Sequence, residues 1–138
     1  MRGALRFTFW FVALEQAFVG VQATLAPHSF YTGFPFGRMW VQYLPPYNEH
    51  LISDVGGFSL AFAILFAWAG ITLARPLYVP LTIAWSVAAI IHAVYHVVNL
   101  QDFPTSDAIV QSFGLFLVAL LPILVIVISA KDVRQLPA

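Results

Sequence analysis

Four long apolar stretches dominate this chain and most constrain what it can fold into. They cover residues 4–26, 51–74, 77–100 and 108–129. A helix needs about 20 mostly apolar residues to cross a bilayer, and each stretch is long enough. Charged residues make up 9% of the 138 residues, whereas a water-soluble domain has about 25%. The sequence therefore predicts one all-α domain over residues 1–138, an integral membrane four-helix bundle, and excludes a soluble globular enzyme.

Basic residues are distributed unevenly between the two sides of the predicted bundle. One side has Arg38 alone, in the loop between the first two spans. The other side carries Arg2, Arg6, Arg75, Lys131 and Arg134. By the positive-inside rule, both termini are expected in the cytoplasm. The six basic residues are scattered and the formal net charge is 0, so we expect no nucleic-acid partner.

The start of the chain resembles a signal peptide, because basic residues precede an apolar run. Glu15 interrupts that run, however, and Pro27 follows its end. The run is also longer than the apolar region of a typical signal peptide, which has about 7–15 residues. We therefore expect a retained first helix.

The predicted outer loop between the first and second spans is rich in aromatic residues. Seven rings fall within 18 residues: Phe30, Tyr31, Phe34, Phe36, Trp40, Tyr43 and Tyr47. Aromatic rings favour the headgroup region of a bilayer, so one interpretation is an interfacial belt. The other is a lid over a pocket at the outer mouth of the bundle.

Each span carries one polar stripe when it is projected at 100° per residue. Ionisable side chains at membrane depth nearly always face the bundle interior, so the stripes are candidates for the functional face. In the second span the stripe contains His50, Ser53, Asp54, Gly57, Ala61 and Trp68. Because small residues let helices approach closely, we expect this face to pack against protein.

Two pairs of residues spaced four apart suggest a metal site. They are His50 with Asp54 and His92 with His96, and each pair stacks on one helix face. If the pairs converge on the outer side, three imidazoles and a carboxylate suit a divalent transition metal such as Zn, Cu or Fe. The chain has no cysteine, so thiolate ligands are excluded. Haem is less favoured, because two histidines on one helix cannot bind opposite faces of a porphyrin and the bundle is small.

Other polar residues are expected to orient these ligands or to relay protons. Glu15 lies near the bilayer centre and would communicate with the cluster through Gln22 or water. The full set is Glu15, Gln22, Glu49, Tyr95, Asn99, Asp102, Asp107 and Gln111.

Three functions are consistent with these patterns. A metal site under an aromatic loop would suit an oxidoreductase that acts on a lipid-soluble substrate, such as a quinone or a lipid. A structural or accessory subunit of a larger membrane complex would use the polar stripes to join its helices. A proton-coupled carrier of small solutes would use Glu15 and would form a homo-oligomer. The sequence leaves open whether the protein is an enzyme.

The span count and the first span carry a resemblance to a known group. With Arg6, Glu15, Gly20 and Pro27, the chain resembles the DoxX-like small four-helix membrane proteins. The segment 48–57 and the later motif residues His92, Tyr95, His96 and Asp102 also resemble uncharacterised bacterial membrane proteins of this type. The resemblance implies a four-helix membrane bundle, with some relatives linked to quinone or sulfur redox complexes. The absence of cysteine argues against a thiol-handling role.

Overall fold

The computed structural model describes residues 1–44 and 46–133, with side chains described up to Ile128. Its helices are α1 (Arg2–Leu25), α2 (Pro27–Gly33), α3 (Glu49–Thr72), α4 (Arg75–Val98) and α5 (Thr105–Val133). Apart from α2, each is long and apolar enough to cross a membrane. The four predicted spans are thus confirmed as helices, each beginning two or three residues earlier than expected. Arg134, used in the topology prediction, lies outside the described residues, as does the side chain of Lys131.

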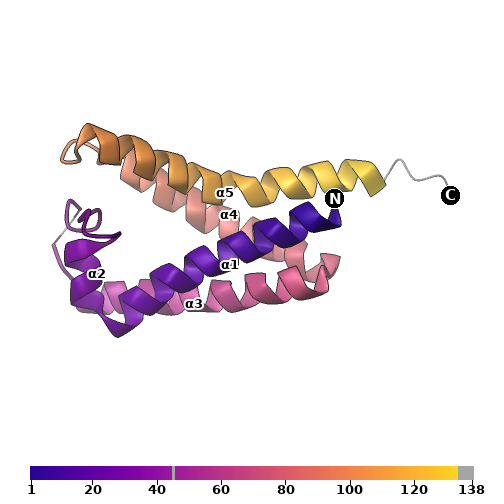
Figure 1. Ribbon diagram of the computed structural model, residues 1–138, viewed down its shortest axis with the longest axis horizontal. Helices are drawn as coiled ribbons and strands as arrows, with labels where there is room; N and C mark the ends of the chain where they lie inside the picture. The colour runs from indigo at the N-terminus through magenta and orange to yellow at the C-terminus, as the bar shows by residue number, and fades with distance from the viewer. Residues whose placement is uncertain (45, 134–138) are drawn as a thin grey trace.

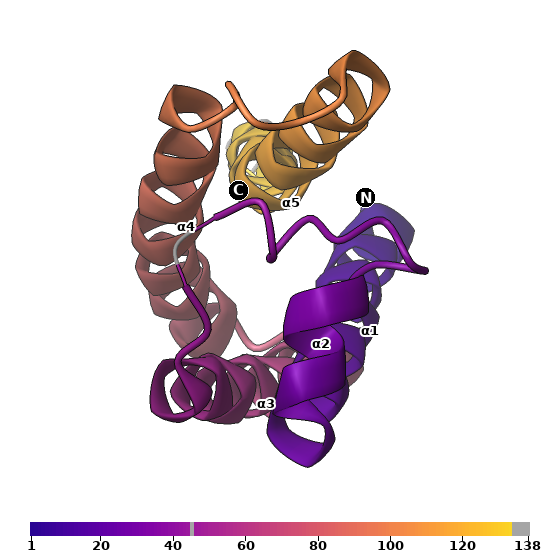
Figure 2. The ribbon, with the colours of Figure 1, turned by 90° about the vertical axis from the view of Figure 1, so that its left-hand side faces the viewer.

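The long helices form two pairs that run the length of the molecule. Helix α1 packs mainly on α3, and α4 packs mainly on α5 (Figure 1). The start of α1 and the end of α5 lie at one end, which we call the termini end. At the opposite end, called the loop end, α2 and the loop residues 34–44 and 46–48 extend across the bundle (Figure 2). Around the bundle, the order of the long helices is α1, α3, α4 and α5.

Local sequence signals explain where the helices begin and end. The Asn48 side chain accepts a hydrogen bond from the Leu51 backbone N–H at 3.2 Å, and so caps the start of α3. Helix α3 ends where Leu73 adopts a left-handed conformation, with φ of 50°. The short helix α2 was not predicted from the sequence, although Pro27 at its start is a favoured first helical residue.

Two glycines allow α1 and α3 to lie close together near the loop end. A Cβ atom added at Gly56 would lie 2.4 Å from Thr24 Oγ1 and 2.8 Å from Thr24 N. A Cβ atom added at Gly20 would lie 2.8 Å from Leu60 Cγ and 2.9 Å from Leu60 N. Lipid tails are as apolar as the helices, so close van der Waals packing of this kind is what holds spans together in a bilayer.

The prediction for the packed face of α3 is wrong. Gly57 has open space around it, and Trp68 is 58% exposed. The face that packs against protein is instead Gly56, Ser59, Ala63, Phe66, Ala69 and Gly70. Small residues occur on both faces of this helix, and the sequence pattern does not tell which of them meets another helix.

The apolar core lies towards the termini end of the bundle. Phe9 of α1 and Phe66 of α3 are fully buried there, with ring centroids 6.2 Å apart. Trp85 of α4 packs edge-on against Phe66, at a centroid distance of 5.8 Å. The buried polar side chains His96, Asp107 and Gln111 instead lie near the loop end of α4 and α5. Among the described residues, the two buried ionisable side chains, His96 and Asp107, are therefore both near the loop end.

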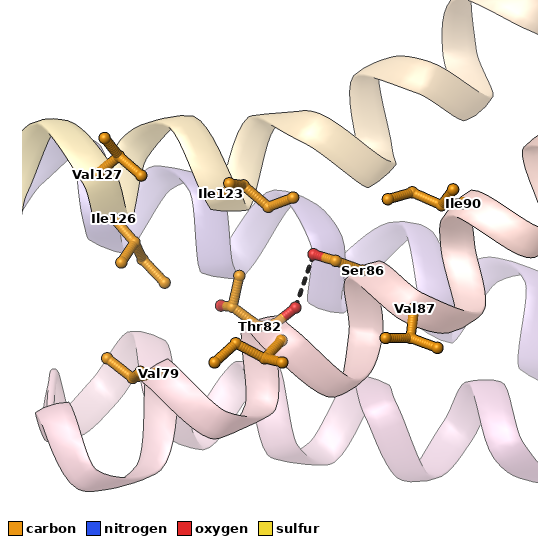
Figure 3. Close-up of a pocket in the computed structure, with 9 residues that line it drawn as sticks. Val79, Thr82, Ser86, Val87, Ile90, Ile123, Ile126 and Val127 are labelled. Carbon is orange, nitrogen blue, oxygen red and sulfur yellow. Dashed lines mark hydrogen bonds between the residues drawn. The ribbon is translucent and has the colours of Figure 1, made fainter.

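A shallow apolar groove of about 360 Å³ runs between α4 and the second half of α5. Branched side chains line it; Ile83 is one of them, and Val87 and Ile123 are labelled in Figure 3. Within it the Ser86 hydroxyl donates a hydrogen bond to the Thr82 carbonyl at 2.7 Å. Ile83 and Val87 are 62% and 58% exposed. The groove therefore belongs to the outer surface of the bundle, which would face lipid.

Candidate functional site

The first predicted ligand pair, His50 and Asp54, forms at the start of α3. Its Nε2 and Oδ2 atoms lie 3.4 Å apart. The side chains are 83% and 50% exposed, so this pair lies on the outside of the protein. An ion pair in such a position contributes little to stability.

The second pair, His92 and His96, forms near the loop end of α4. The ring centroids are 4.5 Å apart and the rings meet at 60°. His96 is buried, and its Nδ1 atom lies 3.0 Å from Oε1 of the buried Gln111 on α5. His92 is exposed and has no hydrogen-bond partner among the described residues. The two histidines and Gln111 form a polar group that we call the His–Gln cluster.

The amide of Gln111 is only half satisfied. The side chain is 1% exposed, and its Nε2 atom has no hydrogen-bond partner among the described residues. If the amide were turned over, Nε2 would meet His96 and Oε1 would be left unpaired, so one amide atom stays free in either orientation. An unpaired polar atom inside a bilayer is unfavourable by several kcal/mol. The His–Gln cluster therefore contains one buried amide atom that no described residue satisfies.

The loop residues 34–44 are tied to α5 by an ion pair. Arg38 and Asp107 form a charge-assisted hydrogen bond through Nη1 and Oδ1. Asp107 is buried, with its side chain 12% exposed, whereas that of Arg38 is 49% exposed. Asp107 lies one helical turn before Gln111, so the ion pair holds the loop beside the His–Gln cluster.

Aromatic contacts also hold this loop against the bundle. Phe34 packs on Phe18 of α1 and Phe30 of α2, at centroid distances of 5.7 and 4.5 Å. Tyr43 packs on Phe103, in the α4–α5 connection, at 5.0 Å. The loop thus contacts both helix pairs at the loop end, and it lines a small pocket there through Tyr43 and Leu44.

Glu15 and Gln22 do not form the expected link to the cluster. Glu15 Oε2 accepts a hydrogen bond from Gln16 Nε2 at 2.6 Å. Gln22 Nε2 instead donates to the Phe18 carbonyl at 3.2 Å. Both contacts stay within α1, so direct hydrogen bonds do not connect Glu15 to α4.

The other predicted residues lie at the loop end. Glu49 Oε2 accepts a hydrogen bond from the Tyr47 hydroxyl at 3.1 Å. Desolvation, and then the hydrogen bond and negative charge of Glu49, raise the pKa of Tyr47 above its usual value. Asn99 Nδ2 donates to the Tyr95 carbonyl at 2.8 Å. Asp102 lines the same pocket as Tyr43, Tyr95 and Asn99.

The structure does not bring the two ligand pairs together. Within residues 1–44 and 46–133, no group of three or more His, Asp and Glu side chains is placed to hold one metal ion. The spacing of four residues fixes each pair on its own helix, but the rotation of α3 turns His50 and Asp54 outward. A metal bound by His50, Asp54, His92 and His96 therefore stays a prediction from the sequence.

Several residues of this region were not predicted. Arg38 had no assigned role, and its partner Asp107 is 69 residues away in sequence. Trp40 Nε1 and Ser112 Oγ are buried without hydrogen-bond partners among the described residues. Gln16 was also missed, although it follows Glu15 directly. A polar residue beside a mid-span carboxylate was the one signal that would have identified Gln16.

The fold and the site together define a helical bundle with four candidate membrane spans and a buried polar cluster near its loop end. Comparison adds no family to this description: the chain matches no protein-family model, no curated protein and no solved structure. The DoxX-like resemblance therefore rests on the sequence features alone.

Proposed function

We propose that this protein is an integral membrane protein that binds the polar group of a lipid-soluble molecule at the His–Gln cluster. The observation that carries the proposal is the unpaired amide atom of Gln111, buried beside His96. A carbonyl or hydroxyl group on a ligand would satisfy that atom, because each accepts a hydrogen bond and a hydroxyl also donates one.

The environment of His92 supports the same proposal. An imidazole in a membrane span is unfavourable unless it has a polar partner, and such residues mark functional sites. His92 is exposed and its ring meets that of His96 at 60°, so its ring nitrogens are free to contact a ligand beside the cluster. A quinone or a lipid carries the required oxygen atoms on an apolar body. Proton transfer at the imidazoles would fit an oxidoreductase that reduces or oxidises such a molecule.

The membrane topology completes the proposal. The four spans bring the start of α1 and the end of α5 to the same end of the bundle (Figure 1). The positive-inside rule places this end in the cytoplasm. The His–Gln cluster then lies in the outer half of a bacterial cytoplasmic membrane, below the aromatic loop. A ligand dissolved in the bilayer would reach the cluster without passing through water.

The test is to identify what purifies with the protein. The wild type and the variant Gln111→Leu, which removes the amide but keeps a similar volume, are purified in lipid nanodiscs and extracted with organic solvent. Mass spectrometry of the wild type should find one lipid-soluble compound near one per chain, and Gln111→Leu should lose it. The matched control is Val110→Leu, one residue away and 52% exposed, which should retain the compound.

Two results would overturn the proposal. If the compound is absent from the wild type, or is equally abundant in Gln111→Leu, the cluster does not bind it and a structural role is favoured. Elemental analysis of the same samples tests the metal prediction separately. A transition metal near one per chain that disappears in the double variant His92→Ala, His96→Ala would support a metal site instead.

A further inference from the structure

A second pocket lies at the loop end, on the side of the Tyr43–Phe103 contact. Its volume is about 270 Å³. It is lined by Tyr43 and Leu44 of the loop, Tyr95 and Asn99 at the end of α4, and Gln101 and Asp102 of the α4–α5 connection. This pocket contains none of the residues of the His–Gln cluster.

The charge of this pocket is negative and unbalanced. Asp102 is exposed and forms no ion pair within the part of the chain that the structure describes. Arg38, the one basic residue of the loop, is already paired with Asp107. The pocket therefore offers a carboxylate without a cation.

The neutral groups of the pocket are also suited to a cation. Asn99 uses its Nδ2 atom to bond the Tyr95 carbonyl, so its Oδ1 atom remains as an acceptor. Tyr43 is fixed against Phe103 at a centroid distance of 5.0 Å. Tyrosine rings attract an ammonium group that comes within about 6 Å of the ring centre. Two tyrosines, a carboxylate and an amide oxygen form a recognition set for an organic ammonium.

The position of the pocket indicates where that ammonium comes from. It lies beside Tyr95 and Asn99 at the end of α4, where that candidate span ends at Val98. This is the level at which lipid headgroups meet water and where tyrosine is enriched. We propose that this pocket binds a primary ammonium group, supplied by the headgroup of an amine-bearing membrane phospholipid.

The experiment compares two lipids that differ in this headgroup. The protein is placed in nanodiscs of phosphatidylglycerol with increasing phosphatidylethanolamine, and native mass spectrometry counts the lipids retained on each chain. The wild type should retain phosphatidylethanolamine in preference to phosphatidylglycerol. Asp102→Asn should lower this retention about twofold to fivefold, as removal of an exposed ion pair of about 0.4–1 kcal/mol would.

Matched variants separate a specific site from a general charge effect. Glu49→Gln removes one negative charge elsewhere at the loop end and should leave retention unchanged. Tyr43→Phe keeps an aromatic ring and should retain the lipid, whereas Tyr43→Leu should lose it. Gln111→Leu should also leave retention unchanged, so this proposal and the proposed function fail or succeed independently. Circular dichroism of each variant confirms that it remains folded.

Free ethanolamine distinguishes the source of the ammonium group. If millimolar ethanolamine displaces the lipid, the pocket recognises the ammonium group alone; if it does not, the bilayer-anchored headgroup is the ligand, and both results support the site. The proposal is overturned if the wild type shows no preference for phosphatidylethanolamine. It is equally overturned if Asp102→Asn and Glu49→Gln reduce retention to the same extent.

Discussion

The indole nitrogen of Trp85 donates a hydrogen bond to the Val118 carbonyl across the α4–α5 contact, at an N···O distance of 3.1 Å. Pro122 lies four residues after Val118 and has no N–H, so α5 cannot supply this carbonyl with its usual helical donor. Trp85 replaces the missing donor from the neighbouring helix. Its ring also packs edge-on against Phe62 and Phe66 of α3, at 5.2 and 5.8 Å. One side chain therefore joins three helices.

The contribution of the Trp85 hydrogen bond to stability should depend on Pro122. Trp85→Phe leaves the Val118 carbonyl unpaired and should lower the free energy of unfolding in micelles by about 1–2 kcal/mol. In a Pro122→Ala background the helix provides its own N–H, so the same replacement should have a smaller effect. Unfolding in SDS, followed by circular dichroism, measures the loss of stability caused by Trp85→Phe in the wild-type and Pro122→Ala backgrounds. The control is Trp68→Phe, because Trp68 is 58% exposed. Equal losses of stability in the two backgrounds would show that the unpaired Val118 carbonyl does not cause the destabilisation.

The α1–α3 contact should be sensitive to a single methyl group. Gly56→Ala places a Cβ atom 2.4 Å from Thr24 Oγ1 and 2.8 Å from Thr24 N, so the helices must separate. Overpacking of this kind lowers stability by about 1–3 kcal/mol. Gly57→Ala is the control, because that Cβ atom meets open space, and it should be neutral or slightly stabilising. The same SDS unfolding assay compares them, and the expected order is contradicted if Gly57→Ala is the more damaging change.

The membrane spans were predictable because they depend on composition alone. Runs of about 20 apolar residues identify a span whatever its neighbours are. Helix rotation was less predictable, since the outside of a membrane bundle is as apolar as its inside. In α3, for example, Gly56 and Gly57 are adjacent glycines on different faces, and the structure buries the first and exposes the second. The short helix α2 was missed because seven residues are too few for a periodic pattern.

The site was predictable within a helix but not between helices. The spacing of His92 and His96 correctly predicted that their side chains lie together one turn apart on α4, with ring centroids 4.5 Å apart. Asp107 and Gln111, which were named among the polar residues expected beside the ligand pairs, are buried. The partner of each residue depends on how helices are ordered and on where the loop lies. Arg38 and Asp107 are 69 residues apart, and no local pattern connects them.

The Tyr47–Glu49 contact predicts a shift in the titration of one tyrosine. Desolvation, the Glu49 hydrogen bond and the Glu49 charge raise the pKa of Tyr47 above the usual value of about 10. The proton is held more tightly in the folded state, so its contribution to stability is present below pH 10 and is lost as the pH rises through the raised pKa. The titration of tyrosines is followed by ultraviolet absorption near 295 nm, and the difference between the wild type and Tyr47→Phe gives the contribution of Tyr47. Glu49→Gln should move it to lower pH, and an unchanged midpoint would exclude Glu49 as a cause.

Cysteine labelling should determine which end of the bundle faces the cytoplasm. The chain has no cysteine, so each introduced thiol reports one position. Gln42→Cys in the loop and Ala74→Cys in the α3–α4 turn are exposed sites at opposite ends. A maleimide that cannot cross membranes should label Gln42→Cys on intact cells, and Ala74→Cys only after the membrane is permeabilised. The reverse pattern would contradict the cytoplasmic location of the termini.

The Arg38–Asp107 ion pair should control how firmly the loop residues 34–44 are held over the bundle. Arg38→Gln leaves the Asp107 carboxylate, whose side chain is 12% exposed, buried without a partner, which is unfavourable. We expect chymotrypsin to cleave the loop several-fold faster in nanodiscs carrying this variant. Asp107→Asn loses the same ion pair but leaves no buried charge, since the unpaired Arg38 is half exposed and stays hydrated. Asp107→Asn should therefore accelerate cleavage less than Arg38→Gln does. The double variant should be cleaved more slowly than Arg38→Gln alone. If both single variants are cleaved equally fast and their effects add, the buried carboxylate is not what destabilises the loop.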